Sequence, residues 1–156
     1  MALTLQSSHL VWQKVAKALA NANPAAQKAF KGLKEYLATQ GGNPNLEFYF
    51  FSEAQADDAD GTGIVDAASE LFGVYIKKAN AATDNWFKLY NNATVDTTDG
   101  DAMVALPLLL ANEEAFAIYP GGLDFSVGIT VTQHTTLIGT TDGSDGGDGF
   151  LIVGAA

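Results

Sequence analysis

The sequence contains neither cysteine nor arginine among its 156 residues. Without cysteine, the chain has no disulfide, no thiolate metal ligand and no cysteine nucleophile. Its eight basic residues are all lysines, and they are outnumbered by 18 acidic residues, which gives a net charge of −10. A nucleic-acid surface needs clustered cations, and arginine is the usual reader of bases and phosphates. We therefore expect no nucleic-acid partner.

Long apolar runs are also missing. No window approaches the ~18 consecutive apolar residues that a membrane span needs, and no basic start followed by an apolar run marks the N-terminus. We therefore expect neither a membrane partner nor a secretory signal. With 47% hydrophobic and 17% charged residues, the composition is that of a folded chain rather than a disordered one.

Charge is distributed unevenly along the chain. Residues 1–45 contain five lysines and one glutamate, a net charge of +4, whereas residues 46–156 contain three lysines and 17 acidic residues, a net charge of −14. This split indicates a chain of two parts, or a basic part that docks on an acidic partner.

The basic part has the pattern of a helical hairpin. A first helix is predicted over residues 8–22, where Val11, Val15, Ala18, Leu19 and Ala22 share one face. A second is predicted over 24–39, with a stripe of Ala26, Phe30, Leu33 and Leu37. Asn23-Pro24 suits the boundary between them, because proline is favoured at the first helical position. Each helix is short, so its stripe must pack on something.

The rest of the chain has the pattern of strands. Leu46–Phe51 is an aromatic strand, and the acidic stretch that follows it is expected to be a linker. The expected division is therefore a helical assembly region over 1–45, an aromatic strand and linker over 46–63, and a β-sandwich over 64–156.

Within 64–156, short strands alternate with turn signals. Phe72, Val74 and Ile76 are expected on one face of a strand, and a strand over 103–110 is expected at an edge, because Pro107 cannot donate to a ladder. Further strands are predicted at 86–90, 115–119 (stopped by Pro120-Gly121-Gly122), 123–132, 135–140 and 150–153. The predicted fold class is α+β, mainly β, with an antiparallel, jelly-roll-like sandwich.

No motif for catalysis emerges. His134 with Ser126 and Asp124 lacks the Gly-x-Ser-x-Gly elbow of a hydrolase, and His134 is expected to be exposed at a strand end. Glu113-Glu114 is expected in a turn. We therefore predict no catalytic residue, no cofactor and no enzymatic activity.

Metal sites are also not indicated. If Gly61 occupies the glycine position of a calcium loop, the first and last ligand positions are Ala56 and Ala67, which offer no side-chain oxygen. Asp142, Asp145 and Asp148 match no specific motif, so a solvated loop is preferred to a Ca²⁺ site. Ca²⁺ binding by this loop is left as an open alternative.

The β segment resembles a β-sandwich domain common in virion proteins of tailed bacteriophages. The likeness is carried by Leu71–Asn80, Asn85–Asn91, the apolar segment from Pro107 to Leu110, and the stretch from Tyr119 to Thr132. It covers roughly half of the chain and is a pattern of strands and turns without a catalytic signature.

This resemblance implies a capsid decoration (cement) protein or a head-fibre or tail accessory protein. The first is preferred: a homo-oligomer, with a trimer favoured, bound to the major capsid protein on the virion surface. The expected contact residues are Trp12, Phe30, Phe48 and Phe50. The alternative is a host-glycan-binding module of a fibre or tail, in which the aromatic residues would line a sugar groove instead of a core.

Overall fold

The computed structural model describes residues 2–3, 20, 24–39, 46–56, 61–78, 85–92, 102–108, 110–137 and 147–155. In chain order the elements are β1 (Ala2–Leu3), α2 (Pro24–Thr39), β2 (Leu46–Phe51), α3 (Glu53–Ala56), β3 (Thr62–Val65), β4 (Ser69–Lys78), β5 (Asn85–Asn91), β6 (Val104–Leu108), β7 (Glu114–Phe125), β8 (Ile129–His134) and β9 (Gly147–Ala155).

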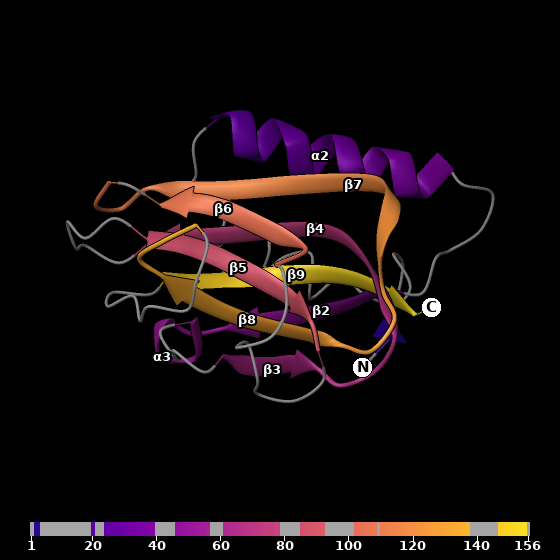
Figure 1. The fold of residues 1–156 in the computed structure, drawn as a ribbon. Coiled ribbons are helices and arrows are strands. Elements are labelled where there is room, and N and C mark those ends of the chain that lie inside the picture. The colour runs from indigo at the N-terminus through magenta and orange to yellow at the C-terminus, as the bar shows by residue number, and fades with distance from the viewer. Residues whose placement is uncertain are drawn as a thin grey trace.

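The strands form two antiparallel sheets that pack face to face (Figure 1). The larger sheet has the order β1-β2-β9-β4-β7, and the smaller sheet has the order β3-β8-β5-β6. Apolar side chains from both sheets fill the space between them, among them Leu71, Val74, Phe87, Ile129 and Leu151. The prediction of a mainly β antiparallel sandwich is confirmed.

Helix α2 covers part of the outer face of the larger sheet, over β7 and β4 (Figure 1). Its apolar stripe buries Ala26, Phe30 and Leu33 in a second core on that face. Pro24 begins the helix, where its missing N–H costs no hydrogen bond. The helix predicted over 24–39 is thus confirmed, whereas the helix predicted over 8–22 lies outside the described residues.

The segment expected to link helices and sandwich contributes to both sheets. β2 pairs with β9 along its whole length, and β3 pairs with β8. Between them, α3 is one short turn that packs against β8 and β9. The side chains of Phe51 and Ala56 belong to the core between the sheets.

A β-bulge in β4 changes the expected alternation. The register with both neighbouring strands shifts between Leu71 and Gly73, which inserts one extra residue and reverses the faces beyond it. Leu71, Val74 and Ile76 therefore face the core between the sheets, while Phe72 packs on the α2 side. The prediction that Phe72 shares a face with Val74 and Ile76 is wrong for this reason.

The strand boundaries around Pro120 also differ from the prediction. β7 does not stop there but continues to Phe125, and the four residues between Ile118 and Leu123 oppose only Phe72 of β4. The turn signal therefore marks a distortion within an edge strand, where proline is tolerated. The strand predicted over 123–132 is instead broken at 126–128, where the chain passes from one sheet to the other.

Two smaller predictions have opposite outcomes. β6 is an edge strand of the smaller sheet and contains Pro107, as expected. The strand expected over 135–140 is absent from Thr135–Leu137, where the chain bends.

Strand β9 lies at the centre of the larger sheet, between β2 and β4. Leu151 and Val153 face the core between the sheets, and Phe150 and Ile152 face the α2 side. At the start of β9, only glycine fits at position 149, because the backbone of β4 and the Phe51 ring lie close to its Cα. A Cβ on Gly149 would lie 2.2 Å from the Tyr75 carbonyl oxygen and 2.5 Å from the Phe51 ring.

We expect Gly149→Ala to lower the free energy of unfolding by about 2–4 kcal/mol, because the added methyl must displace backbone of β4. Urea denaturation followed by tryptophan fluorescence measures the change. Gly121→Ala is the matched control: a Cβ there meets nothing within 4 Å, so its effect should not exceed about 1 kcal/mol. Equal stability of the two variants would contradict the close packing of β4 against Gly149.

A second prediction concerns Gln133, which pairs with Phe87 and so faces the core between the sheets. It is 0% exposed, and among the described residues neither of its amide atoms has a hydrogen-bond partner. Gln133→Met should raise the free energy of unfolding by about 1–3 kcal/mol, because it removes an unsatisfied buried amide at similar volume. Gln27→Met, on the exposed side of α2, should stay within about 0.5 kcal/mol. A less stable Gln133→Met variant would show that the amide is satisfied in solution.

Candidate functional site

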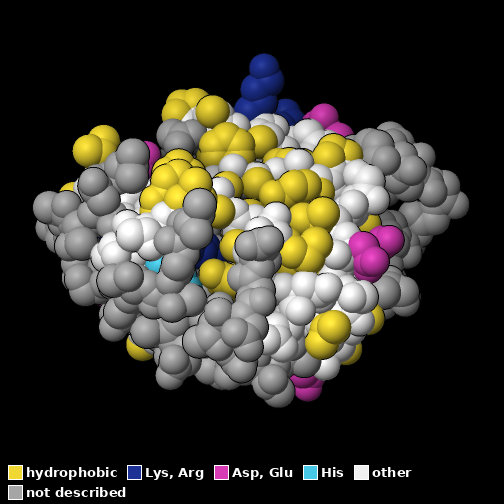
Figure 2. All heavy atoms as spheres, in the orientation of Figure 1, with side chains coloured by type: hydrophobic (Ala, Val, Ile, Leu, Met, Phe, Trp, Pro, Cys, Tyr) yellow, Lys and Arg dark blue, Asp and Glu magenta, His cyan; other side chains and the backbone are white. Residues whose placement is uncertain are grey.

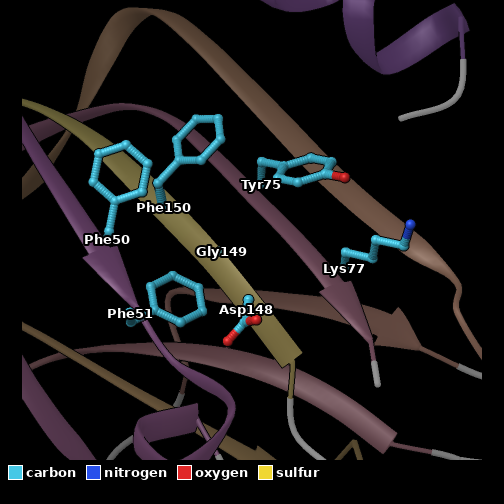
Figure 3. Close-up of a pocket in the computed structure, with 7 residues that line it drawn as sticks. All are labelled: Phe50, Phe51, Tyr75, Lys77, Asp148, Gly149 and Phe150. Carbon is cyan, nitrogen blue, oxygen red and sulfur yellow. The ribbon is translucent and has the colours of Figure 1, made fainter. Parts of the chain in front are cut away.

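A pocket of about 290 Å³ opens where β9 begins (Figure 3). We call it the aromatic pocket. Its lining residues come from the three adjacent strands β2, β9 and β4, and they are Phe50, Phe51, Tyr75, Lys77, Asp148, Gly149 and Phe150.

Three rings on one side of the sheet form its apolar wall. Phe150 is the cross-strand partner of both Phe50 and Tyr75, so the three side chains stand on the same face, as Figure 3 shows. The ring centroids lie 5.6 Å apart for Phe50–Phe150 and 5.4 Å apart for Tyr75–Phe150. Phe150 and Tyr75 are buried, but 44% of Phe50 is exposed.

Phe30 of α2 packs against the buried part of this wall and leaves Phe50 exposed. Its ring covers Phe150 at 5.4 Å, Tyr75 at 6.1 Å and Phe116 at 6.4 Å. The helix thus covers β7 and β4, and Phe50 on β2 lies beyond it.

Two opposite charges line the pocket. The Asp148 carboxylate accepts a hydrogen bond of 2.9 Å from the Glu53 backbone N–H, which fixes its orientation at the start of α3. In Figure 3 the Lys77 ammonium and the Asp148 carboxylate point away from each other. Within the described part of the chain, neither forms a salt bridge.

Lys77 has an unusual position among the lysines of residues 46–156. The other two, Lys78 and Lys88, are each 1% exposed, whereas Lys77 is half-buried at the surface. The Lys78 ammonium lies inside the sandwich and donates to the Leu108 carbonyl oxygen at 3.1 Å. Lys77 is therefore the only lysine of this segment that a ligand can reach.

A second group of polar side chains lies on the outer face of the smaller sheet. Lys88 is opposite Thr132, and Tyr90 is opposite Thr130 on the neighbouring strand. All four are buried, and burial lowers the pKa of Lys88. The threonines alternate with Ile129 and Val131 along β8, and no sequence signal indicated their burial.

His134 belongs to the same face and corrects a prediction. It was expected to be exposed at a strand end, but it is 0% exposed within β8 and its ring meets Tyr90 edge-on at 6.4 Å. Ser126 lies far from it. Ser126 accepts a hydrogen bond from Asn91, whereas His134 pairs with Trp86, five positions away along β5, or about 17 Å. The described residues therefore do not assemble Ser126 and His134 into a catalytic arrangement.

The acidic candidates are placed only in part. Glu113 lies in the turn before β7, and its carboxylate accepts from the Leu110 N–H, while Glu114 begins β7. The acidic residues at 57–60, and Asp142 and Asp145, lie outside the described residues. Among the residues that are described, no group of three or more potential ligands could hold a metal ion.

The four expected contact residues have different environments. Phe30 is 2% exposed and packs inside the chain, Phe48 is half-buried, and Phe50 is exposed. Trp12 lies outside the described residues. The aromatic strand β2 therefore supplies both core and surface, and Phe50 is the member available to a partner.

Comparison with known proteins does not extend this picture. No family model, no curated protein and no solved structure matches the chain. In the described residues, no helix has the length and apolarity needed to cross a membrane.

Tyr75, which lines the aromatic pocket, makes the stability of the fold depend on pH. Burial first, and then the Glu114 carboxylate, raise the pKa of Tyr75 from 10.0 to about 12. The unfolded chain therefore loses this proton at lower pH than the folded chain. The stabilisation is complete below pH 10 and is lost as the pH rises through 12. Urea midpoints at pH 9 and pH 11 should fall more for the wild type than for Tyr75→Phe; equal decreases would contradict the raised pKa.

Proposed function

We propose that the chain is a capsid decoration protein of a tailed bacteriophage, an oligomer bound to the major capsid protein on the virion surface. The observation that carries the proposal is the strand order, in which β2-β9-β4-β7 faces β3-β8-β5-β6. This is the order of a jelly roll, an architecture used by viral capsid and lectin domains. The step from architecture to function is an analogy between folds, and the sequence resemblance points the same way.

The sheet edges favour association through surfaces rather than through added strands. Pro107 lies in the edge strand β6 and Pro120 in the edge strand β7, while the other edges, β1 and β3, have two and four residues. Proline and short length both protect an edge from pairing with another chain.

Apolar surface near β6 offers such a contact. Met103 precedes β6 and is 40% exposed, and Leu110 follows it and is 69% exposed. Figure 2 shows apolar side chains gathered in the part of this view where β6 and β7 run. Exposed apolar surface can mark a protein interface, and we assign this surface to contacts between copies and with the shell.

The cementing mechanism follows from repetition. Each copy would bury a modest apolar area, and many equivalent copies would add association free energy over the whole shell. The basic region 1–45, as a helical hairpin that includes Trp12, would add an electrostatic contact. The acidic remainder would oppose non-specific association of free oligomers in solution.

A second candidate function is a host-glycan-binding module of a head fibre or tail accessory protein. It is favoured by one observation: the exposed Phe50 ring lies beside Asp148 and Lys77 in an open pocket.

Light scattering coupled to size exclusion tests the decoration proposal, together with sedimentation of the protein with shells that lack it. We expect a trimer that co-sediments with shells. The double variant Met103→Ser/Leu110→Ser should weaken both associations at least about tenfold, the equivalent of 1.4 kcal/mol. The matched control Val127→Ser/Leu137→Ser changes side chains that are 49% and 50% exposed elsewhere, and it should leave both unchanged.

Removal of residues 1–23 tests the first part of the basic region; it leaves α2 on the sheet but also removes the two-residue edge strand β1. Loss of shell binding with a trimer retained would assign this region to the shell. A monomer that binds no shell, or a chain found only at tail fibres, would contradict the decoration proposal.

A further inference from the structure

We propose that the aromatic pocket binds one neutral pyranose ring of a saccharide, stacked on Phe50, with a hydroxyl bonded to Asp148. The inference names the site that the second candidate function requires, and it rests on that function rather than on capsid decoration. The pocket lies on the outer face of the larger sheet, whereas Met103 and Leu110 flank a strand of the smaller sheet.

Size and shape set the first limit on the ligand. Pockets for small molecules occupy ~300–1,000 Å³, so a volume of about 290 Å³ is enough for a single ring. The wall formed by Phe50, Phe150 and Tyr75 is apolar and fixed, since two of its rings are buried in the second core. A ligand with one flat apolar face fits against it, and the C–H face of a pyranose is such a surface.

The charges set the second limit. A net charge on the ligand would be attracted by one of the two groups, Asp148 and Lys77, and repelled by the other, so the pocket favours neither an anion nor a cation. A wholly apolar side chain of another protein would take water from both charged groups without replacing its hydrogen bonds, which is costly. A ligand rich in hydroxyls suits either group, because a hydroxyl can donate to the carboxylate or accept from the ammonium.

The site is also preorganised at Asp148. The bond from the Glu53 N–H holds the Asp148 Oδ1 atom in place, and among the described residues Lys77 has no salt bridge that a ligand would have to break. Asp148 therefore loses little conformational freedom when a ligand binds, and this small entropic cost favours affinity.

Amide chemical shifts of the full chain give the test, with D-galactose, D-glucose and N-acetyl-D-glucosamine as probes up to 100 mM. We expect saturable shifts at Phe50, Tyr75, Gly149 and Phe150 with at least one sugar, at a Kd on the order of 1–10 mM, as for a small site with few contacts. Phe50→Ala should weaken this binding at least about tenfold. Met103→Ala, which alters a side chain of similar exposure at another surface, should leave it unchanged.

A second variant makes the result independent of folding defects in Phe50→Ala. Asp148→Asn keeps an oxygen for the Glu53 N–H but removes the charge, and it should weaken sugar binding at least several-fold. No saturable shift with any of the three sugars would overturn the inference. The same amides shifting with protein concentration alone would overturn it too, because the pocket would then receive another copy of the chain.

The two proposals fail separately. Sugar binding that survives both Phe50→Ala and Asp148→Asn would refute this pocket while leaving a glycan-binding function in place elsewhere on the chain. A glycan array without any hit would remove the second candidate function as well. Neither result changes the oligomer or shell-binding measurements that test decoration.

Discussion

Burial of β9 on both faces is the constraint on which the rest of the structure depends. One face of this strand supplies Leu151 and Val153 to the core between the sheets, and the other supplies Phe150 and Ile152 to the core under α2. Among the described strands, it also provides the only ladder that joins β1 and β2 to β4 and β7. Without it, α2 would lose the Phe150 ring on which Phe30 packs, and the aromatic pocket would lose its floor.

The lysines show how this architecture shapes the surface. Lys78 extends between the sheets to the Leu108 carbonyl, and Lys88 is buried on the outer face of the smaller sheet. Two of the three cations in residues 46–156 are thus removed from the surface. The exposed part of this segment is therefore more acidic than its formal charge suggests, and Lys77 beside the aromatic pocket is the exception.

Several elements could be predicted from local patterns. The helix at 24–39 has a stripe and a proline start, β2 is a compact aromatic run, and Pro107 identified an edge strand. The failures have one cause, which is that faces are decided by distant partners. A single extra residue in β4 moved Phe72 to the other side, and His134 is buried although it was expected to be exposed. The pocket joins residues nearly 100 positions apart, such as Phe50 and Phe150, so no spacing in the sequence reveals it.

The position of β9 in the chain has a consequence for biosynthesis. Its partners β2 and β4 are translated long before residues 147–155. Neither strand can pair with β9 until β9 has left the ribosome. Pairing across such separations is slow, and unpaired strands of partly made chains are prone to association. This delay makes the yield of folded chain sensitive to the rate of synthesis.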